Sequence, residues 1–146
     1  MFLALCVLVV SGPLMAQDEH RAPAAVQKSF QKDYPEAKDA QWSSTNGQWH
    51  AGFSDHSQTD NGEMVANYDQ DGIHIDSQIP YDLSDVPSVV VDQTQKNYPG
   101  GTNYAYTRIE RPVGDPLFQV DMNLQNKNKT TYMDEGGHEQ KYPGRH

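Results

Sequence analysis

The densest group of possible metal ligands lies in residues 69–76, which read Asp-Gln-Asp-Gly-Ile-His-Ile-Asp. Closely spaced carboxylates suit calcium, but an EF-hand loop also needs glycine at its sixth position and glutamate at its twelfth. In this segment glycine is the fourth residue, and Pro80 stands at the twelfth position. The pattern therefore favours a hairpin turn in which Gly72 has a positive φ. Residues 134–137, Asp-Glu-Gly-Gly, favour the same turn.

Six histidines are the other candidate metal ligands. No two of them are separated by two or four residues, the spacings that place two imidazoles on one face of a strand or helix. His50 and His74 alternate with apolar residues and are expected on the outer faces of strands. The other four are expected in loops or tails: His20, His56, His138 and His146. We therefore predict no metal site and no cofactor.

Short catalytic motifs are missing from the sequence. It contains no Gly-x-Ser-x-Gly, no Walker loop, no His-Glu-x-x-His and no Gly-x-Gly-x-x-Gly. Nothing in their spacing singles out two of the 20 acidic residues as a catalytic pair. We therefore predict that the protein is not an enzyme.

Aromatic residues on one predicted strand are the strongest indication of a binding surface. In residues 103–110, we expect Ala105 and its alternate neighbours to face a helix, which leaves Tyr104, Tyr106 and Arg108 on an open face. Tyrosine and arginine are enriched at the energetic centres of protein interfaces. The opposite register, with both tyrosines in the core, is the alternative.

Polar residues on other predicted strands extend this candidate surface. In residues 117–124 polar and apolar side chains alternate, which indicates one solvated face and one core face. Trp49, Ala51 and Phe53 share a face and are expected in the core. The candidate partner-binding residues are Tyr104, Tyr106, Arg108, Gln119, Asp121, Tyr132 and His50.

The elements that carry these residues are repeated at an offset of 64 residues. Residues 23–35 align with residues 87–99, and six of the thirteen positions are identical. Trp42 then falls opposite Tyr106, so it is expected in the core or between the repeats. The Asp-x-x-Gly turns align after a slip of one residue. Self-similarity of this length indicates two copies of one supersecondary unit.

Each copy begins with a predicted helix and continues with predicted strands. Val26, Phe30 and Tyr34 form one apolar stripe, and Tyr-Pro ends each helix. Asn46-Gly47 predicts a tight hairpin. The strands are expected at 40–44, 48–54, 63–68 and 73–77 in the first copy, and at 103–110, 117–124 and 129–133 in the second. The predicted fold class is α+β: two tandem repeats of a helix plus an antiparallel sheet, forming an extended sheet.

The N-terminal residues differ from the rest of the chain. Residues 1–16 are apolar and uncharged and contain Cys6, the only cysteine; we interpret them as a signal peptide cleaved near Ala16. A flexible segment (17–22), the first repeat (23–80), the second repeat (81–140) and a tail (141–146) are expected to follow. The net charge of −9 argues against nucleic acid as a partner. The apolar run Met1–Val10 is too short for a transmembrane helix, and the sequence has no second run. The mature protein is expected to be a monomer.

These motifs together resemble a family. The relevant residues are Tyr34-Pro35, Trp42, the segment Ala66-Asn-Tyr-Asp-x-Asp-Gly72, Leu83-x-x-Val-Pro87 and Tyr98-Pro-Gly100. The chain is similar to PepSY-like, β-lactamase-inhibitor-protein-like periplasmic proteins of Bacteroidetes-type bacteria. The resemblance implies export and an extended, often concave sheet built from two repeats. The resemblance does not assign an activity, and it identifies no inhibitory residue in this sequence.

We therefore expect a periplasmic or secreted binding module that holds a protein or peptide of the cell envelope on the open face of its sheet, with a possible inhibitory or regulatory role. The alternative is a module that binds a small ligand or a glycan. In that alternative the aromatic residues would stack on the ligand, and the Asp-rich turns would bind calcium.

Overall fold

The structure is a computed structural model that describes residues 21–55 and 62–142. The expected signal peptide, most of the 17–22 segment, His20, His56 and residues 143–146 lie outside these residues. The first repeat contains α1 (Ala24–Asp33), β1 (Gln41–Thr45), β2 (Gln48–Ser54), β3 (Glu63–Tyr68) and β4 (His74–Tyr81). The second contains α2 (Ser88–Asn97), β5 (Thr102–Glu110), β6 (Leu117–Leu124), β7 (Lys127–Met133) and β8 (Glu139–Gln140).

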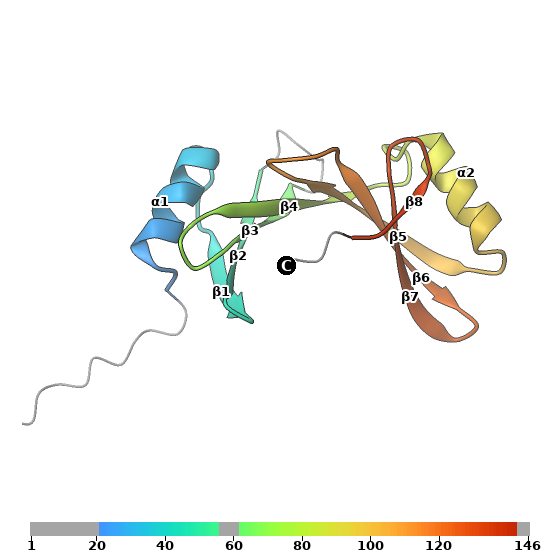
Figure 1. Cartoon of the computed structure of the whole chain (residues 1–146), viewed down its shortest axis with the longest axis horizontal. Helices are drawn as coiled ribbons and strands as arrows, with labels where there is room; N and C mark the ends of the chain where they lie inside the picture. Colours follow the sequence, from blue (N-terminus) through green and yellow to red (C-terminus); the bar gives the residue numbers. More distant parts are fainter. Residues whose placement is uncertain (1–20, 56–61, 143–146) are drawn as a thin grey trace, which may run out of the picture.

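All eight strands form a single antiparallel sheet in the order of the chain. The two repeats are joined because β4 of the first pairs with β5 of the second. The helices cover opposite ends of this sheet, as Figure 1 shows. The strand registers place both cores on the same side of the sheet, the helix face; neither helix of residues 21–55 and 62–142 lies on the other side, the open face. The predicted α+β fold is confirmed.

Each helix packs one apolar stripe against the helix face. Val26 and Phe30 of α1 are buried against β2, β3 and β4. In α2 the equivalent positions are Val90 and Thr94, and the Thr94 hydroxyl donates to the Val90 carbonyl at 2.7 Å. The second core therefore has no aromatic ring from α2 at the position equivalent to Phe30. Phe118 of β6 is one of the buried side chains of this core.

The two Asp-x-x-Gly turns are built in the same way. Asp69 Oδ1 accepts from the N–H groups of Asp71 and Ile73 at 2.9 and 2.8 Å. Asp134 Oδ1 accepts from the N–H groups of Gly136 and His138, both at 2.9 Å. Gly72 and Gly137 have positive φ values of 83° and 78°. Since the carboxylates are engaged by backbone donors, the geometry supports the predicted hairpin turns rather than a calcium loop.

Three strands differ from the prediction by more than one residue. β4 continues through the expected link to Tyr81, because Tyr81 packs against both cores and holds the strand extended. β7 begins two residues early, since Gln125 and Asn126 both adopt positive φ and close a two-residue hairpin. β8 was not predicted from the sequence; it pairs with Tyr132 and Met133 of β7.

A hydrogen-bonded cluster fastens β8 to the rest of the second repeat. The Glu139 carboxylate accepts from the Thr131 hydroxyl at 2.6 Å and from the Tyr98 hydroxyl at the end of α2. These bonds, that from Thr131 first, hold the pKa of Glu139 below its usual range. The contribution of Glu139 to stability is therefore present above about pH 4.3, the ordinary glutamate value, and is lost as the pH falls through the lower pKa of the folded state.

Glu139→Gln is expected to lower stability at pH 7 and to have a progressively smaller effect as the pH falls towards 3, because more of the wild-type carboxylate is then protonated as well. Urea unfolding at several pH values between about 3 and 7 measures this difference. Glu36→Gln is the control, because no ion pair involves Glu36 within 21–55 and 62–142. An effect of Glu139→Gln that stays constant with pH would contradict the assignment.

Candidate functional site

Two tyrosines of the predicted binding surface lie in the core, so their placement on the open face was wrong. Tyr106 is buried among the second-core residues, and Tyr104 packs against that core with its ring stacked 6.5 Å from the Tyr106 ring. Ala105, expected to face α2, is exposed on the open face. The alternation itself holds, but in the opposite register. The repeat contained the signal, because Tyr106 aligns with Trp42, which packs against the first core as predicted.

Arg108 also lies on the helix face, where its guanidinium group is paired with carboxylates of the same chain. Its guanidinium carbon lies 6.0 Å from the ring centres of both Tyr81 and Phe118. It forms ion pairs of 3.1 Å with Glu110 and Glu135. Arg108 therefore stabilises the junction between the two repeats, and the prediction that it lies on the open face was wrong.

The other four candidate residues do lie on the open face. His50 pairs with Asn67 across β2 and β3, while Gln119 pairs with Tyr132 across β6 and β7. Asp121 lies on the same face and accepts from Gln119 Nε2 at 2.7 Å and from the Thr130 hydroxyl at 2.5 Å. Gln119 and Asp121 thus form one small polar group. No contact with a partner has been observed for these four residues, so their role in binding stays a prediction.

A row of hydrogen bonds crosses the middle of the open face. His50 Nδ1 lies 2.6 Å from Asn67 Oδ1, Asn67 Nδ2 donates to Asp76 Oδ1 at 2.6 Å, and the Tyr142 hydroxyl donates to Asp76 Oδ2 at 2.5 Å. Because the Asn67 amide oxygen is an acceptor, Nδ1 of His50 is the donor. The Tyr142 ring lies 4.9 Å from that of Tyr132. The row thereby links His50 to Tyr132.

Tyr142 also changes the expected exposure of this face. Asn67 and Asp76 are only 4% and 3% exposed, and Ile109 and Leu117 are buried on the same side of the sheet. The open face is therefore covered at its centre, where we expected a continuous solvated surface. The free parts lie to either side, over the first repeat and over the second.

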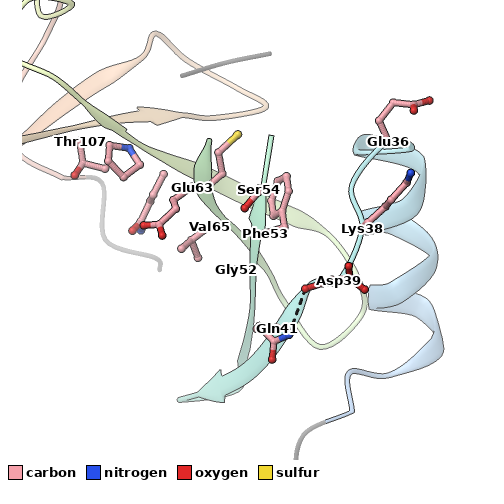
Figure 2. Close-up of a pocket in the computed structure, with 13 residues that line it drawn as sticks. Glu36, Lys38, Asp39, Gln41, Gly52, Phe53, Ser54, Glu63, Val65 and Thr107 are labelled. Atoms are coloured by element: carbon pink, nitrogen blue, oxygen red, sulfur yellow. Dashed lines mark hydrogen bonds between the residues drawn. The ribbon is translucent and has the colours of Figure 1, made fainter. Parts of the chain in front are cut away.

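A groove of about 720 Å³ crosses the open face over the first repeat. Its floor is formed by successive strands β2 to β5, through Gly52, Val65, Gln78 and Thr107. Figure 2 labels Gly52, Val65 and Thr107 among the lining residues. Apolar side chains and charged side chains both line it. The apolar ones are Phe53, Met64, Val65 and Pro80, and the charged ones are Glu36, Lys38, Asp39 and Glu63.

Gly52 gives the groove its depth. A Cβ atom at this position would meet only the Gln41 carbonyl oxygen, at 3.8 Å, so the space above the strand is empty. None of the candidate binding residues lines the groove. The one indication in the sequence was a glycine inside a predicted strand, which marks a place where another chain or ligand can approach the backbone.

The described part of the chain shows neither a metal site nor a membrane span. No three His, Cys, Asp or Glu side chains within 21–55 and 62–142 are close enough together to hold an ion. In the same residues, neither helix is long and apolar enough to cross a membrane.

Comparisons with known proteins show the fold. No protein-family model matches the chain, and no curated protein sequence matches it. A solved structure of a predicted periplasmic protein from Bacteroides eggerthii has 21% identity and a TM-score of 0.71, covering 83% of this chain and 87% of its own. A DUF2874 family protein from Bacteroides uniformis has 22% identity and a TM-score of 0.72, covering 83% and 88%.

A BLIP-like protein from Bacteroides fragilis has the same fold as well. It has 20% identity and a TM-score of 0.67, covering 86% of this chain and 92% of its own. The resemblance inferred from the sequence motifs is therefore confirmed at the level of the fold. These neighbours are not known enzymes.

Proposed function

We propose that this chain is an exported, non-enzymatic module that binds a segment of a protein or peptide in the groove of its open face. The observation that carries this proposal is the groove itself, about 720 Å³ in volume, on the side of the sheet that no helix covers. Its mixture of apolar, polar and charged lining residues is typical of sites that recognise peptides and ligands.

The fold neighbours support the cellular setting of the proposal. Their description as predicted periplasmic and BLIP-like proteins agrees with the apolar N-terminal segment of this chain. We therefore place the proposed partner in the cell envelope. The four open-face residues predicted from the sequence, which flank the groove rather than line it, are proposed as secondary contacts.

Gly52→Trp is expected to abolish binding while leaving the fold intact. The backbone at Gly52 has no positive φ, and a Cβ there meets no close atom, so the strand tolerates a side chain. An indole at this position would fill the middle of the groove. Peptides selected from a random displayed library on the wild-type protein are expected to lose at least about tenfold in affinity. Fluorescence anisotropy measures the affinity, and thermal unfolding checks the fold.

Ser43→Trp is the matched control. Ser43 is exposed on the open face of β1 but does not line the groove. The Ser43→Trp variant is expected to bind the selected peptides with the affinity of the wild type. Peptides that bind all three proteins equally, or a library that yields none, would refute the proposed function.

A further inference from the structure

Charged side chains are distributed unevenly between the two faces of the sheet. The strands contain three basic residues, Arg108, Lys127 and Lys129, and their registers place all three on the helix face. On the open face the strands present carboxylates instead: Glu63, Asp76 and Asp121. The open side of the sheet is therefore acidic, with no strand lysine or arginine to balance it.

The groove repeats this imbalance at its rim. Three carboxylates line it, those of Glu36, Asp39 and Glu63, against the single ammonium group of Lys38. Three negative charges and one positive charge leave a net charge of −2 in the lining. Within residues 21–55 and 62–142, no salt bridge involves any of these four side chains. The rim therefore offers uncompensated negative charge above a floor that includes the apolar side chain of Val65.

Building on the proposed function, we propose that the segment bound in this groove is a cationic stretch of another protein, in which lysine or arginine alternates with apolar residues. An extended chain directs successive side chains to opposite sides. One set of side chains packs on Val65 and Pro80, and the other reaches the rim carboxylates. Complementary charge gives such a complex its specificity and a fast, salt-dependent association.

The direct test compares three labelled seven-residue peptides that alternate valine with lysine, glutamine or glutamate. In fluorescence anisotropy at about 25 mM salt, the lysine peptide is expected to bind at least about tenfold more tightly than the glutamine peptide. The glutamate peptide is expected not to bind. Raising the salt to about 300 mM is expected to weaken the lysine peptide severalfold, because the rim charges are exposed.

The triple variant Glu36→Gln/Asp39→Asn/Glu63→Gln identifies the charges that matter. It is expected to bind the lysine and glutamine peptides with the same affinity. The matched control, Asp71→Asn/Asp85→Asn/Asp92→Asn, removes the same charge from exposed residues that do not line the groove. It is expected to keep at least half of the lysine-peptide affinity.

The outcomes separate this inference from the proposed function. If library peptides bind and Gly52→Trp abolishes their binding, but the rim variant still prefers the lysine peptide as the wild type does, the cationic partner is refuted and the binding groove stands. If Gly52→Trp leaves the binding of the lysine peptide and of the library peptides unchanged, the lysine peptide is held by general attraction to an acidic protein, and both proposals fail.

Discussion

Phe30→Ala is expected to lower the free energy of unfolding by about 3–5 kcal/mol, the usual range for deleting a buried aromatic ring. Phe30 is 5% exposed and lies at the centre of the first core. Its ring lies 5.0 Å from that of Phe53, 5.3 Å from Trp42 and 6.4 Å from Tyr68, each in an edge-on arrangement. These neighbours come from three different strands, so no single movement closes the cavity. Urea unfolding followed by circular dichroism measures the change.

Thr94→Val is the control at the equivalent position of the second repeat. It replaces a hydroxyl that donates to the Val90 carbonyl of its own helix and neighbours the buried Tyr106 hydroxyl, and it is expected to lower stability by about 1–2 kcal/mol. A Phe30→Ala effect no larger than that of Thr94→Val would mean that the aromatic cluster does not stabilise the fold.

Phe30→Ala also tests whether the two repeats unfold together. Trp42 and Trp49, the only tryptophans, lie in the first repeat. Tryptophan fluorescence therefore follows that repeat, whereas circular dichroism follows both. Because β4 pairs with β5 and Tyr81 packs against both cores, the two signals are expected to coincide in the variant as in the wild type. Two separate transitions would show that the junction does not couple the repeats.

The parts of the fold that sequence reasoning predicted are those where local patterns agree with tertiary packing. β2, β3 and β6 have the predicted limits, because alternating side chains and turn residues define both ends of each strand. The register of β5 was not predicted correctly. Alternation shows that Tyr104 and Tyr106 share a face, but only the position of α2 decides which face is buried.

The groove, and the covered centre of the open face beside it, could not be predicted from local patterns. The lining of the groove combines the loop after α1 with five strands, β1 to β5, so no short segment contains its residues together. Tyr142 contacts Asp76 from 66 residues away, and the tail that contains it showed no pattern. The charge asymmetry of the two faces, by contrast, can be predicted from the sequence once the strand registers are known, because it depends only on which residues alternate along each strand.

Gly72→Ala and Gly137→Ala are each expected to destabilise the protein by about 2–5 kcal/mol. A methyl group on Gly72 would lie 2.8 Å from the Ala25 carbonyl oxygen in the first turn of α1. A methyl group on Gly137 would lie 2.9 Å from the carbonyl oxygen of Val89, the residue of α2 that aligns with Ala25. Both glycines also have positive φ, which alone costs an alanine about 1–2 kcal/mol. The contact with the helix backbone adds about 1–3 kcal/mol of overpacking.

Gly100→Ala separates these two contributions. Gly100 has a similar φ of 86°, but nothing lies within 4 Å of a Cβ atom there. It is expected to lose only the backbone part, about 1–2 kcal/mol, in the same urea unfolding experiment. A larger loss at both turn glycines would show that each hairpin turn supports the first turn of its helix, so that the Asp-x-x-Gly turns are helix contacts repeated at equivalent positions. Equal losses at all three glycines would instead show that Gly72 and Gly137 are needed only for the positive φ of their turns.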